Sequence, residues 1–242
     1  MRKKLNKNYF GIHNHTIYSN IRLLDATNQP KDLIDKAIEL GLSGIAITDH
    51  ECLSAHVKAE KYMLSIRDKY PDFKLAFGNE IYLTETRDSG QKYYHFILIA
   101  KDAIGHRALR ELSSRAWLNS YTDRKMERVP TLKTELEEVV NKFSGHLIAT
   151  TACIGGELPQ NALLYATARK INDDNNAMLY YKKIHNFITY CQDLFKDDFY
   201  IECAPGTSSE QKTANQLLKR IANAYGIKMV VGTDAHYLKK QT

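Results

Sequence analysis

Histidine, carboxylate and cysteine side chains recur beside short apolar runs of this sequence. His13 and His15 are separated by one residue at the end of the first run, and side chains two apart on a strand point the same way. Two imidazoles placed like this can bind one metal ion. A single His-x-His pair is as readily a chance pair of surface or core histidines, so a metal site needs further ligands.

Further candidate ligands follow other apolar runs. GIAIT leads into Asp49 and His50, and MVVGT leads into Asp234 and His236. The third, fourth and fifth runs add one candidate each, namely Glu80, His95 and Cys153. Taken singly, these three have ordinary alternatives as a solvated charge, a hydrogen-bonded core histidine and a small buried hydrophobe. The joint pattern favours one shared metal site.

The residue types constrain the metal and the reaction. Histidine and thiolate ligands favour zinc, whereas carboxylates also suit manganese or iron. The candidates outnumber the four ligands of a structural zinc site, so we expect two or three divalent ions. Such clusters activate water and neutralise charge on a phosphate under attack. The sequence has no serine-elbow, Walker or dinucleotide motif, and a metal thiolate explains Cys153 more economically than a nucleophile does.

Apolar runs typical of strands alternate with amphipathic stretches typical of helices. The predicted strands are Tyr9–His15, Gly44–His50, Lys74–Leu83, Tyr93–Lys101, His146–Cys153, Phe199–Cys203 and Lys228–Asp234. The predicted helices include Lys31–Leu40, Ser54–Lys69, Ile104–Ser120, Leu132–Lys142, Asp174–Phe195 and Ser208–Tyr225. This alternation predicts an α/β fold, a (β/α)7 TIM-like barrel with a parallel closed sheet. An open doubly wound sheet is the alternative.

In such barrels the active site lies at the C-terminal ends of the strands, where the candidate ligands fall. No Pro/Gly/Ser-rich linker or internal repeat divides the chain, so we expect a single domain over residues 1–242. The polar, basic segment Tyr121–Thr131 contains a proline and is expected to project from the barrel as a lid or a loop.

The composition is that of an ordinary globular protein, with 43% hydrophobic and 26% charged residues. No apolar run is long enough to span a membrane, and the basic start lacks the apolar stretch of a secretory signal. We therefore expect a cytoplasmic protein without a membrane partner. The four cysteines lack CxxC pairing, which disfavours a zinc ribbon. The net charge of +6 is compatible with a polyanionic partner.

The order of the motifs HNHTIYS, LLD, ITDH, GNE, YYHF, TTACIGGELP, YIE and GTDAHYL resembles the PHP (polymerase and histidinol phosphatase) family along the whole chain. Within that family the chain is most similar to the N-terminal PHP domain of bacterial DNA polymerase III alpha subunits. The resemblance implies a distorted barrel with a metal cluster at the strand ends. The implied metal ligands are His13, His15, Asp25, His50, Glu80, His95, Cys153, Asp234 and His236. The residues implied to be catalytic are His13, His15, His50, Asp234 and His236.

Positions beside this ligand set have more than one interpretation. The Thr16–Leu24 stretch is longer than in many relatives, so Asn20 competes with Asp25 for one ligand position. Asp49 is interpreted as a residue that orients a ligand, because ligating imidazoles usually donate their second N–H to such a group. Glu202 either does the same or lies at the barrel edge.

The resemblance implies a metal-dependent phosphoesterase domain with 3′–5′ exonuclease activity on the 3′ end of single-stranded DNA. The alternatives are a histidinol-phosphatase-like phosphomonoesterase and a non-catalytic, metal-bound module of a polymerase. The resemblance also implies that these residues hold no polymerase core, and that a polymerase core or other replisome subunits are partners. We expect Arg124 and Lys125 to contact DNA, within a basic set that includes Arg107, Arg110, Arg115 and Arg128. The alternative for this set is a solvated helix face.

Overall fold

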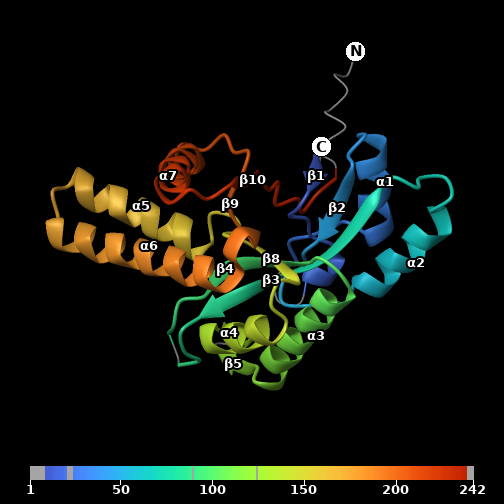
Figure 1. The fold of residues 1–242 in the computed structure, drawn as a ribbon, viewed down its shortest axis with the longest axis horizontal. Helices are drawn as coiled ribbons and strands as arrows, with labels where there is room; N and C mark the ends of the chain where they lie inside the picture. The colour runs from blue at the N-terminus through green and yellow to red at the C-terminus, as the bar shows by residue number, and fades with distance from the viewer. Residues whose placement is uncertain (1–8, 21–23, 89, 124, 239–242) are drawn as a thin grey trace, which may run out of the picture.

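The computed structural model describes residues 9–20, 24–88, 90–123 and 125–238. Its centre is a sheet that curls into a nearly closed barrel, with strands in the spatial order β1-β2-β3-β4-β8-β9-β10 (Figure 1). A backbone bridge from Asn14 to Ala235 joins the two ends of this path. The predicted distorted α/β barrel is therefore confirmed. The strands are β1 (Phe10–Gly11), β2 (Gly44–Ile47), β3 (Lys74–Thr84), β4 (Tyr94–Ala100), β8 (Leu147–Thr150), β9 (Phe199–Cys203) and β10 (Met229–Val231).

Strand β4 runs against the direction of its neighbours. The pairs β1–β2, β2–β3, β8–β9 and β9–β10 are parallel, but β4 is antiparallel to both β3 and β8. The predicted fully parallel sheet is therefore wrong at β4. The connection from Thr84 to Tyr94 is too short for the crossover that a parallel neighbour needs. As a result, the beginning of β4 lies at the rim where the other strands end.

Helices cover the outside of the sheet. They are α1 (Pro30–Glu39), α2 (His56–Ile66), α3 (Ala103–Leu118), α4 (Lys133–Lys142), α5 (Glu157–Lys170), α6 (Asp174–Phe195) and α7 (Ser209–Tyr225). Helices α1 and α2 lie together beside β2, α3 packs on α4, and α5 and α6 extend as a pair on the far side (Figure 1). Among the helices the structure describes, none is both long and apolar enough to cross a membrane.

Local chemistry explains where several helices begin and end. Asp102, Asp173 and Ser208 each accept a hydrogen bond from a backbone N–H three residues later, which caps α3, α6 and α7. Pro30 opens α1, where its missing N–H has no partner to lose. Gly226 ends α7 with a φ of 67°, a left-handed conformation that glycine adopts without strain.

Helix α5 was not among the predicted helices, although the others lie within a few residues of their predicted ends. Its buried side chains include Leu158, Asn161 and Ala168, and the helix packs against both α6 and α7. A helix that is covered from more than one direction has no single apolar stripe. Periodicity was therefore a poor signal for this segment.

The predicted projection at Tyr121–Thr131 is a hairpin followed by a short strand. The hairpin pairs β5 (Tyr121–Asp123) with β6 (Met126–Arg128), and β7 (Thr131–Leu132) pairs with the end of β3. The hydroxyl of Tyr121 contacts that of Tyr93, and the Arg128 guanidinium lies 5.9 Å from the centre of the Tyr93 ring. These contacts attach the hairpin to the start of β4.

Three apolar clusters hold the fold together. The largest packs β3, β4, β8 and β9 against α3 to α7, and the second packs β2 against α1 and α2. The third lies between strands and includes Ala46, Ile97, Ile99 and Ala152. Full burial of a side chain such as Ile97 stabilises the fold by about 1.5–3 kcal/mol. The rim of the barrel, in contrast, is formed by polar side chains.

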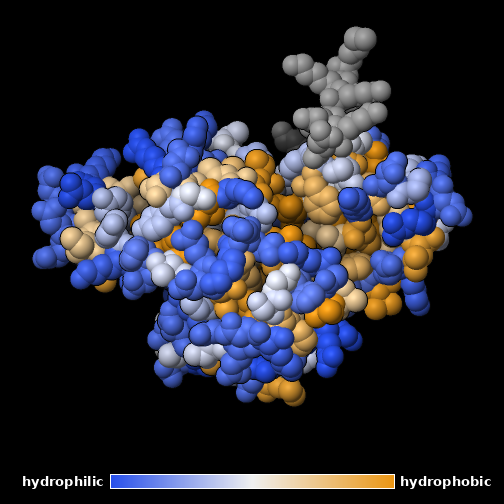
Figure 2. Space-filling model, viewed as in Figure 1, coloured by the Kyte–Doolittle hydropathy of each residue, from blue (hydrophilic) through white to orange (hydrophobic). Residues whose placement is uncertain are grey.

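The seam between β10 and β1 carries exposed apolar side chains. Figure 2 shows hydrophobic surface between α7 and α1, and Val231 and Tyr237 are 46% and 57% exposed. In the part of the chain that the structure describes, no helix follows β10. The seam therefore lacks the helical cover that the neighbouring strands have.

His56 is expected to make the fold less stable in mild acid. It is buried, its Nε2 lies 3.0 Å from the Gly78 carbonyl oxygen, and its Nδ1 lies 3.1 Å from Nε2 of His106. Burial, helped by the charge of His106, lowers the pKa of His56 to about 4 from 6.5. Between these values the unfolded chain binds a proton that the folded chain does not, so the free energy of unfolding falls as pH falls through this window. The loss attributable to His56 is up to roughly 3 kcal/mol.

The variant His56→Gln tests this prediction, because its amide N–H can still donate to Gly78 while it has no proton to gain. Urea unfolding is measured at pH 7 and pH 4.5 for wild type and variant, both in the presence of a chelator. The free energy of unfolding should fall less between these pH values in the variant than in wild type. The imidazoles at the rim titrate equally in both proteins and cancel in the comparison. Equal losses in the two proteins would show that His56 is not responsible.

Candidate metal centre

Eight of the nine predicted ligands fall into three groups, within each of which the ligand atoms lie within 4.8 Å of one another. The groups are His15 with His50 and His236, then His13 with His15, Glu80 and Asp234, and finally Glu80 with His95 and Cys153. His15 is shared by the first two groups, and Glu80 by the last two. Three neighbouring positions with shared ligands could each hold a metal ion.

The sheet brings these residues together because each of them lies at or near one rim. His13 and His15 follow β1, His50 follows β2, Cys153 follows β8, and Asp234 with His236 follow β10. Glu80 lies within the long strand β3, and His95 is the second residue of the reversed strand β4. Isolated backbone bridges continue the sheet at Asn14–Ala235, His50–Glu80 and His95–Gly156. The candidate ligands are thus supported by backbone hydrogen bonding beyond the strand ends.

Glu80 is the centre of the cluster and is fully buried. Its Oε2 lies 3.5 Å from His13 Nε2, 3.2 Å from His15 Nε2 and 2.9 Å from His50 Nδ1. Its other oxygen, Oε1, lies 2.7 Å from His95 Nδ1. One carboxylate therefore lies beside four imidazoles from three different segments of the chain.

Asp25 is the ninth predicted ligand, and it lies beside the first group. Its Oδ2 is 3.9 Å from Nε2 of both His50 and His236. The competing residue Asn20 accepts hydrogen bonds from the backbone N–H groups of Asp25 and Ala26 at 3.1 and 2.9 Å. Its side-chain oxygen therefore stabilises the loop and is not directed at the cluster. The geometry favours Asp25 over Asn20 at this position.

Three carboxylate oxygens of the cluster are buried and make no well-directed hydrogen bond, although two of them lie close to imidazole nitrogens. They are Asp25 Oδ1, Glu80 Oε2 and Asp234 Oδ1. A buried polar atom left unsatisfied costs about 1–3 kcal/mol, and more when it is charged, so such atoms are rare in stable folds. A divalent cation would satisfy all three, and oxygen with imidazole and thiolate is a donor set for zinc, manganese or iron. The residues present therefore fit bound ions.

The electrostatics of the cluster are dominated by its carboxylates. Burial lowers the pKa of His13, but the charges of Glu202 and Glu80 outweigh burial and raise it well above its ordinary value. His15 is also buried, and its contacts with Asp234 and Glu80 raise its pKa to about 9. In His50, burial prevails and lowers the pKa. Imidazoles must lose a proton to bind metal, so ion binding here releases protons.

The carboxylates respond in the opposite direction. Burial would raise the pKa of Glu80, but the charges of His95, His50 and His13 hold it well below its ordinary value. The pKa of Asp234 falls to about 2 because contacts with His15 and His13 outweigh its burial. Both carboxylates are thus ionised at neutral pH, as cation binding requires.

Asp49 orients the site indirectly, in agreement with its interpretation from the sequence. Its carboxylate accepts hydrogen bonds from the backbone of Thr16 at 2.6 Å and from the hydroxyl of Ser19 at 2.7 Å. The same Ser19 hydroxyl lies 3.0 Å from His15 Nδ1. Ser19 was missed in the sequence, although it lies four residues after His15 in the 3-10 turn Ile17–Ser19. The Asp49–Ser19 pair holds the His15 ring with Nε2 toward the cluster.

Glu202 holds His13 in the same manner, which decides between its two interpretations. Its Oε1 lies 2.7 Å from His13 Nδ1, and its Oε2 accepts a hydrogen bond from Thr150 at 2.5 Å. A Cβ atom at Gly232 would lie 1.8 Å from Glu202 Oε1, so only glycine leaves room for this carboxylate. Glu202 is therefore a buried support for a candidate ligand, not an edge residue.

Tyr82 was also missed. Its hydroxyl lies 3.4 Å from His50 Nδ1, and its ring centre lies 4.8 Å from that of His95. The available signal was spacing, because Tyr82 is two residues from Glu80 on β3 and therefore faces the same side. It forms part of the wall between two candidate ligands.

The backbone is strained beside the cluster. Glu51, Ala152 and Asp234 have φ values of 55°, 56° and 48°, a left-handed region that residues other than glycine seldom adopt. Glu51 directly follows His50, Ala152 directly precedes Cys153, and Asp234 is itself a member of the cluster. Such conformations cost of order 1–3 kcal/mol each and gather at functional sites, where surrounding structure imposes them.

Cys153 lies in the group with Glu80 and His95. Its Sγ is 3.4 Å from His95 Nδ1 and 4.0 Å from Glu80 Oε1. Burial, together with the charges of Glu80 and Asp234, raises the pKa of the Cys153 thiol far above its ordinary value. A thiolate nucleophile is therefore disfavoured unless a cation lies beside the sulfur.

Cys153→His is expected to keep its ion and to retain activity within about tenfold of wild type, because a tenfold loss is only about 1.4 kcal/mol and imidazole can replace thiolate as a ligand. Cys153→Ser, a near-isosteric control, should lose more metal. Elemental analysis and hydrolysis of an activated phosphodiester measure both. A fully metallated but inactive histidine variant, or a phosphate adduct trapped on Cys153, would favour covalent catalysis instead.

The predicted DNA contacts are only partly placed. Lys125 lies at the turn of the β5–β6 hairpin with an exposed side chain, whereas Arg124 lies outside the described residues. Arg115 pairs with Glu111 and Glu138 at 2.9 and 2.6 Å. Arg128 is also occupied, by Asp123 and the Tyr93 ring. These intramolecular contacts favour the solvated-face interpretation for Arg115 and Arg128.

Residues 11–205 of the chain match the PHP domain family. The DNA-directed DNA polymerase of Bacillus phage SPbeta is 45% identical over 243 residues, a match that covers 96% of this chain and 19% of the polymerase. The DNA polymerase III subunit alpha of Borreliella burgdorferi is 31% identical over 237 residues, covering 95% of this chain and 18% of the subunit. The chain thus spans about a fifth of the length of these relatives.

Solved structures share the fold at low sequence identity. A candidate metal-dependent phosphoesterase from Bifidobacterium adolescentis has a TM-score of 0.51 and 17% identity, covering 97% of this chain and 90% of that protein. An amidohydrolase from Chromobacterium violaceum has a TM-score of 0.52 and 12% identity, covering 94% and 87%. These similarities support the barrel fold.

Proposed function

This chain belongs to the PHP family, and from that premise we propose that it is a metal-dependent phosphodiesterase that shortens single-stranded DNA from its 3′ end. The observation that carries the proposal is the gathering of eight candidate ligands in three linked groups at one rim, with buried carboxylate oxygens that make no well-directed hydrogen bond. DNA is the proposed substrate because the relatives named above are DNA polymerases. A polymerase core is the proposed partner for the same reason.

The proposed ligands are the nine residues from His13 to His236 named above. Bound zinc or manganese ions would supply positive charge to a phosphate and lower the pKa of a water molecule. The protein supplies position, because Glu202 fixes the His13 ring and the Asp49–Ser19 pair fixes the His15 ring. Preorganised groups of this kind need no rearrangement when charge develops during the reaction.

The exposed side of the cluster indicates where a phosphate would approach. The side chains of His13, His15 and Glu80 are 0% exposed, whereas those of Asp25, Asp234 and His95 are 33%, 29% and 29% exposed. We therefore propose that substrate reaches the cluster over the face that carries Asp25, Asp234 and His95. Arg124 and Lys125 are proposed contacts farther along the DNA.

A nuclease assay with defined ends tests the proposal. Single-stranded DNA labelled at its 5′ end should be shortened from the 3′ end with manganese or zinc present. A blocked 3′ end should abolish the reaction, whereas a blocked 5′ end should not. Hydrolysis of phosphomonoesters without DNA cleavage would replace the proposal with a phosphomonoesterase. Inactivity on every phosphate ester with metal bound would leave a structural module.

A further inference from the structure

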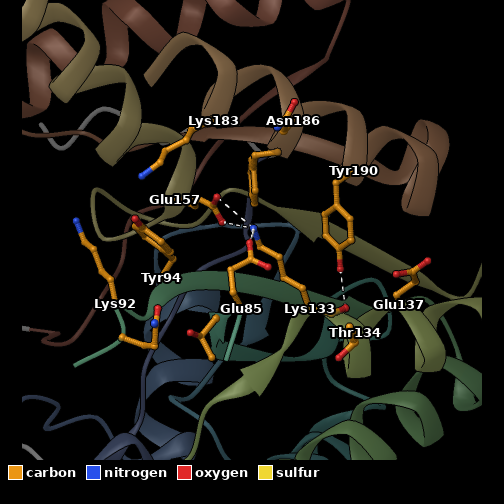
Figure 3. A pocket seen from close by; sticks show the side chains of 13 residues that line it. Glu85, Lys92, Tyr94, Lys133, Thr134, Glu137, Glu157, Lys183, Asn186 and Tyr190 are labelled. Carbon is orange, nitrogen blue, oxygen red and sulfur yellow. Dashed lines mark hydrogen bonds and ion pairs between the residues drawn. The ribbon is translucent and has the colours of Figure 1, made fainter. Parts of the chain in front are cut away.

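A cavity of about 560 Å³ lies between the β3–β4 connection and helices α4, α5 and α6 (Figure 3). None of the candidate metal ligands lines it. Its volume falls in the range of roughly 300–1,000 Å³ that is usual for small-molecule sites. Its walls come from Glu85 and Tyr94 beside the strands, Lys133 of α4, Glu157 of α5 and Lys183 of α6.

The floor of this cavity is built around a held ammonium group. Lys133 Nζ lies 2.5 Å from Glu85 Oε1 and 3.0 Å from Glu157 Oε2. It also lies 5.7 Å and 5.8 Å from the ring centres of Phe187 and Tyr190. Lys133 is thus held by two carboxylates, and the charge of Lys183 also acts on Glu157. The floor is therefore preformed.

The mouth of the cavity carries two lysines that, unlike Lys133, form no ion pair within the described residues. Lys92 donates to the neutral Gln160 Oε1 at 2.8 Å and lies over the Tyr94 ring, and Lys183 lies 5.8 Å from the Tyr180 ring. Within the described residues, neither has a carboxylate at ion-pair distance. Figure 3 shows both lysines on the side of Tyr94, with Tyr190 and Glu137 on the opposite side. Two ammonium groups of this kind on one side suit a phosphate.

The remaining lining suits a planar ring with polar edges. Tyr94 offers an aromatic face, and base–aromatic stacking contributes about 1–3 kcal/mol per base. The side chains of Gln91, Thr134 and Asn186 line the cavity and have no hydrogen-bond partner among the residues described. These groups are available as donors and acceptors for a base or sugar.

We propose that this cavity binds one nucleotide unit, with its phosphate between Lys92 and Lys183 and its ring toward the floor. The choice of a nucleotide among phosphorylated ring compounds rests on the function proposed above. Tyr94 lines the cavity and its neighbour His95 belongs to the metal cluster, because adjacent side chains on a strand face opposite sides. A DNA strand that crosses the rim at β4 would meet both sites.

Calorimetric titration of the full chain with thymidine monophosphate, thymidine and inorganic phosphate tests the cavity. Thymidine monophosphate should bind more tightly than either fragment. Lys92→Ala and Lys183→Ala should each weaken binding by about tenfold, the size expected for one charge-assisted contact at an exposed site. Lys182→Ala, an exposed neighbour on α6 that does not line the cavity, is the matched control and should change nothing.

Several results would overturn the nucleotide site. They are no binding of thymidine monophosphate, equally tight binding of phosphate alone, or equal losses in Lys182→Ala and Lys183→Ala. Binding that is lost in Asp234→Asn but kept in both lysine variants would place the ligand at the metal cluster and would also overturn the proposal.

The source of the nucleotide is resolved by competition with a short thymidine oligonucleotide that carries uncleavable phosphorothioate links. If the oligonucleotide displaces thymidine monophosphate, and Lys183→Ala raises KM for DNA but leaves hydrolysis of a small phosphodiester unchanged, the cavity holds part of a strand. If it does not compete, the cavity holds the free nucleotide. Nucleotide binding that persists in a protein inactive on every phosphate ester would contradict the proposed function but not the cavity.

Discussion

Replacing Asp234 with asparagine is expected to lower phosphodiester hydrolysis by at least on the order of 100-fold. Asp234 Oδ1 lies 3.2 Å from Nε2 of both His13 and His15, and it is one of the buried oxygens that make no well-directed hydrogen bond. Because the pKa of Asp234 is about 2, the substitution removes a full negative charge at any working pH. An amide of the same size cannot replace that charge toward an ion.

The fold should survive this substitution. The φ of Asp234 is 48°, and asparagine adopts this left-handed region more readily than most residues. The test is the rate of 3′ shortening of single-stranded DNA, with thermal unfolding measured alongside. Asp72→Asn, at an exposed position before β3, is the matched control and should keep full activity. A contaminating nuclease would leave the Asp234→Asn preparation as active as wild type.

Glu80→Gln is expected to have the largest effect on metal content, with a loss of at least one ion per chain. Glu80 belongs to two of the three ligand groups and touches His13, His15, His50 and His95. Glutamine keeps the shape but turns an amide N–H2 toward imidazoles that are also donors when protonated. Activity should fall by about 100- to 1000-fold, as when a charge-stabilising group is removed.

Elemental analysis after metal resupply measures the expected loss, and circular dichroism checks that the variant is folded. Removal of one partner from a buried charge cluster costs about 3–5 kcal/mol, so a lower melting temperature is expected as well. Glu210→Gln, an exposed carboxylate in the first turn of α7, serves as the control. An unchanged ion count in folded Glu80→Gln would contradict the central position given to this residue.

The gathering of the candidate ligands at one rim could be predicted from the sequence, whereas the direction of strand β4 could not. His50, Cys153 and Asp234 each lie just after an apolar run. Their positions therefore predict one shared rim even when the pairing of the strands is not known. The direction of a strand could not be predicted, because the alternation of side chains along a strand is the same in both directions. His95 carried an overlooked signal, because a ligand at the start of a strand can reach the common rim only if that strand is reversed.

Supporting residues were harder to predict than ligands. Glu202 and Ser19 contact His13 and His15, but the sequence left two interpretations open for Glu202 and gave no reason to single out Ser19. The left-handed backbone at Glu51 and Ala152 is imposed by tertiary contacts and leaves no trace in composition. One domain over all 242 residues, and the identity and number of ions, stay predictions.

The pairing of the first strand with the last strand determines when the candidate metal site is completed during folding. It is joined by hydrogen bonds from His15 N to Ala235 O at 3.0 Å and from Ala235 N to His13 O at 3.3 Å. The hairpin that carries Glu80 and His95 spans a short loop and can form early, whereas pairing across more than 200 residues is a late and slow event in folding. A nascent chain therefore has seven of the nine candidate ligands and two open sheet edges until Asp234 and His236 emerge. During that interval the unpaired edges of β1 and β9 are exposed to pairing with other chains, and completion of the ring removes this hazard.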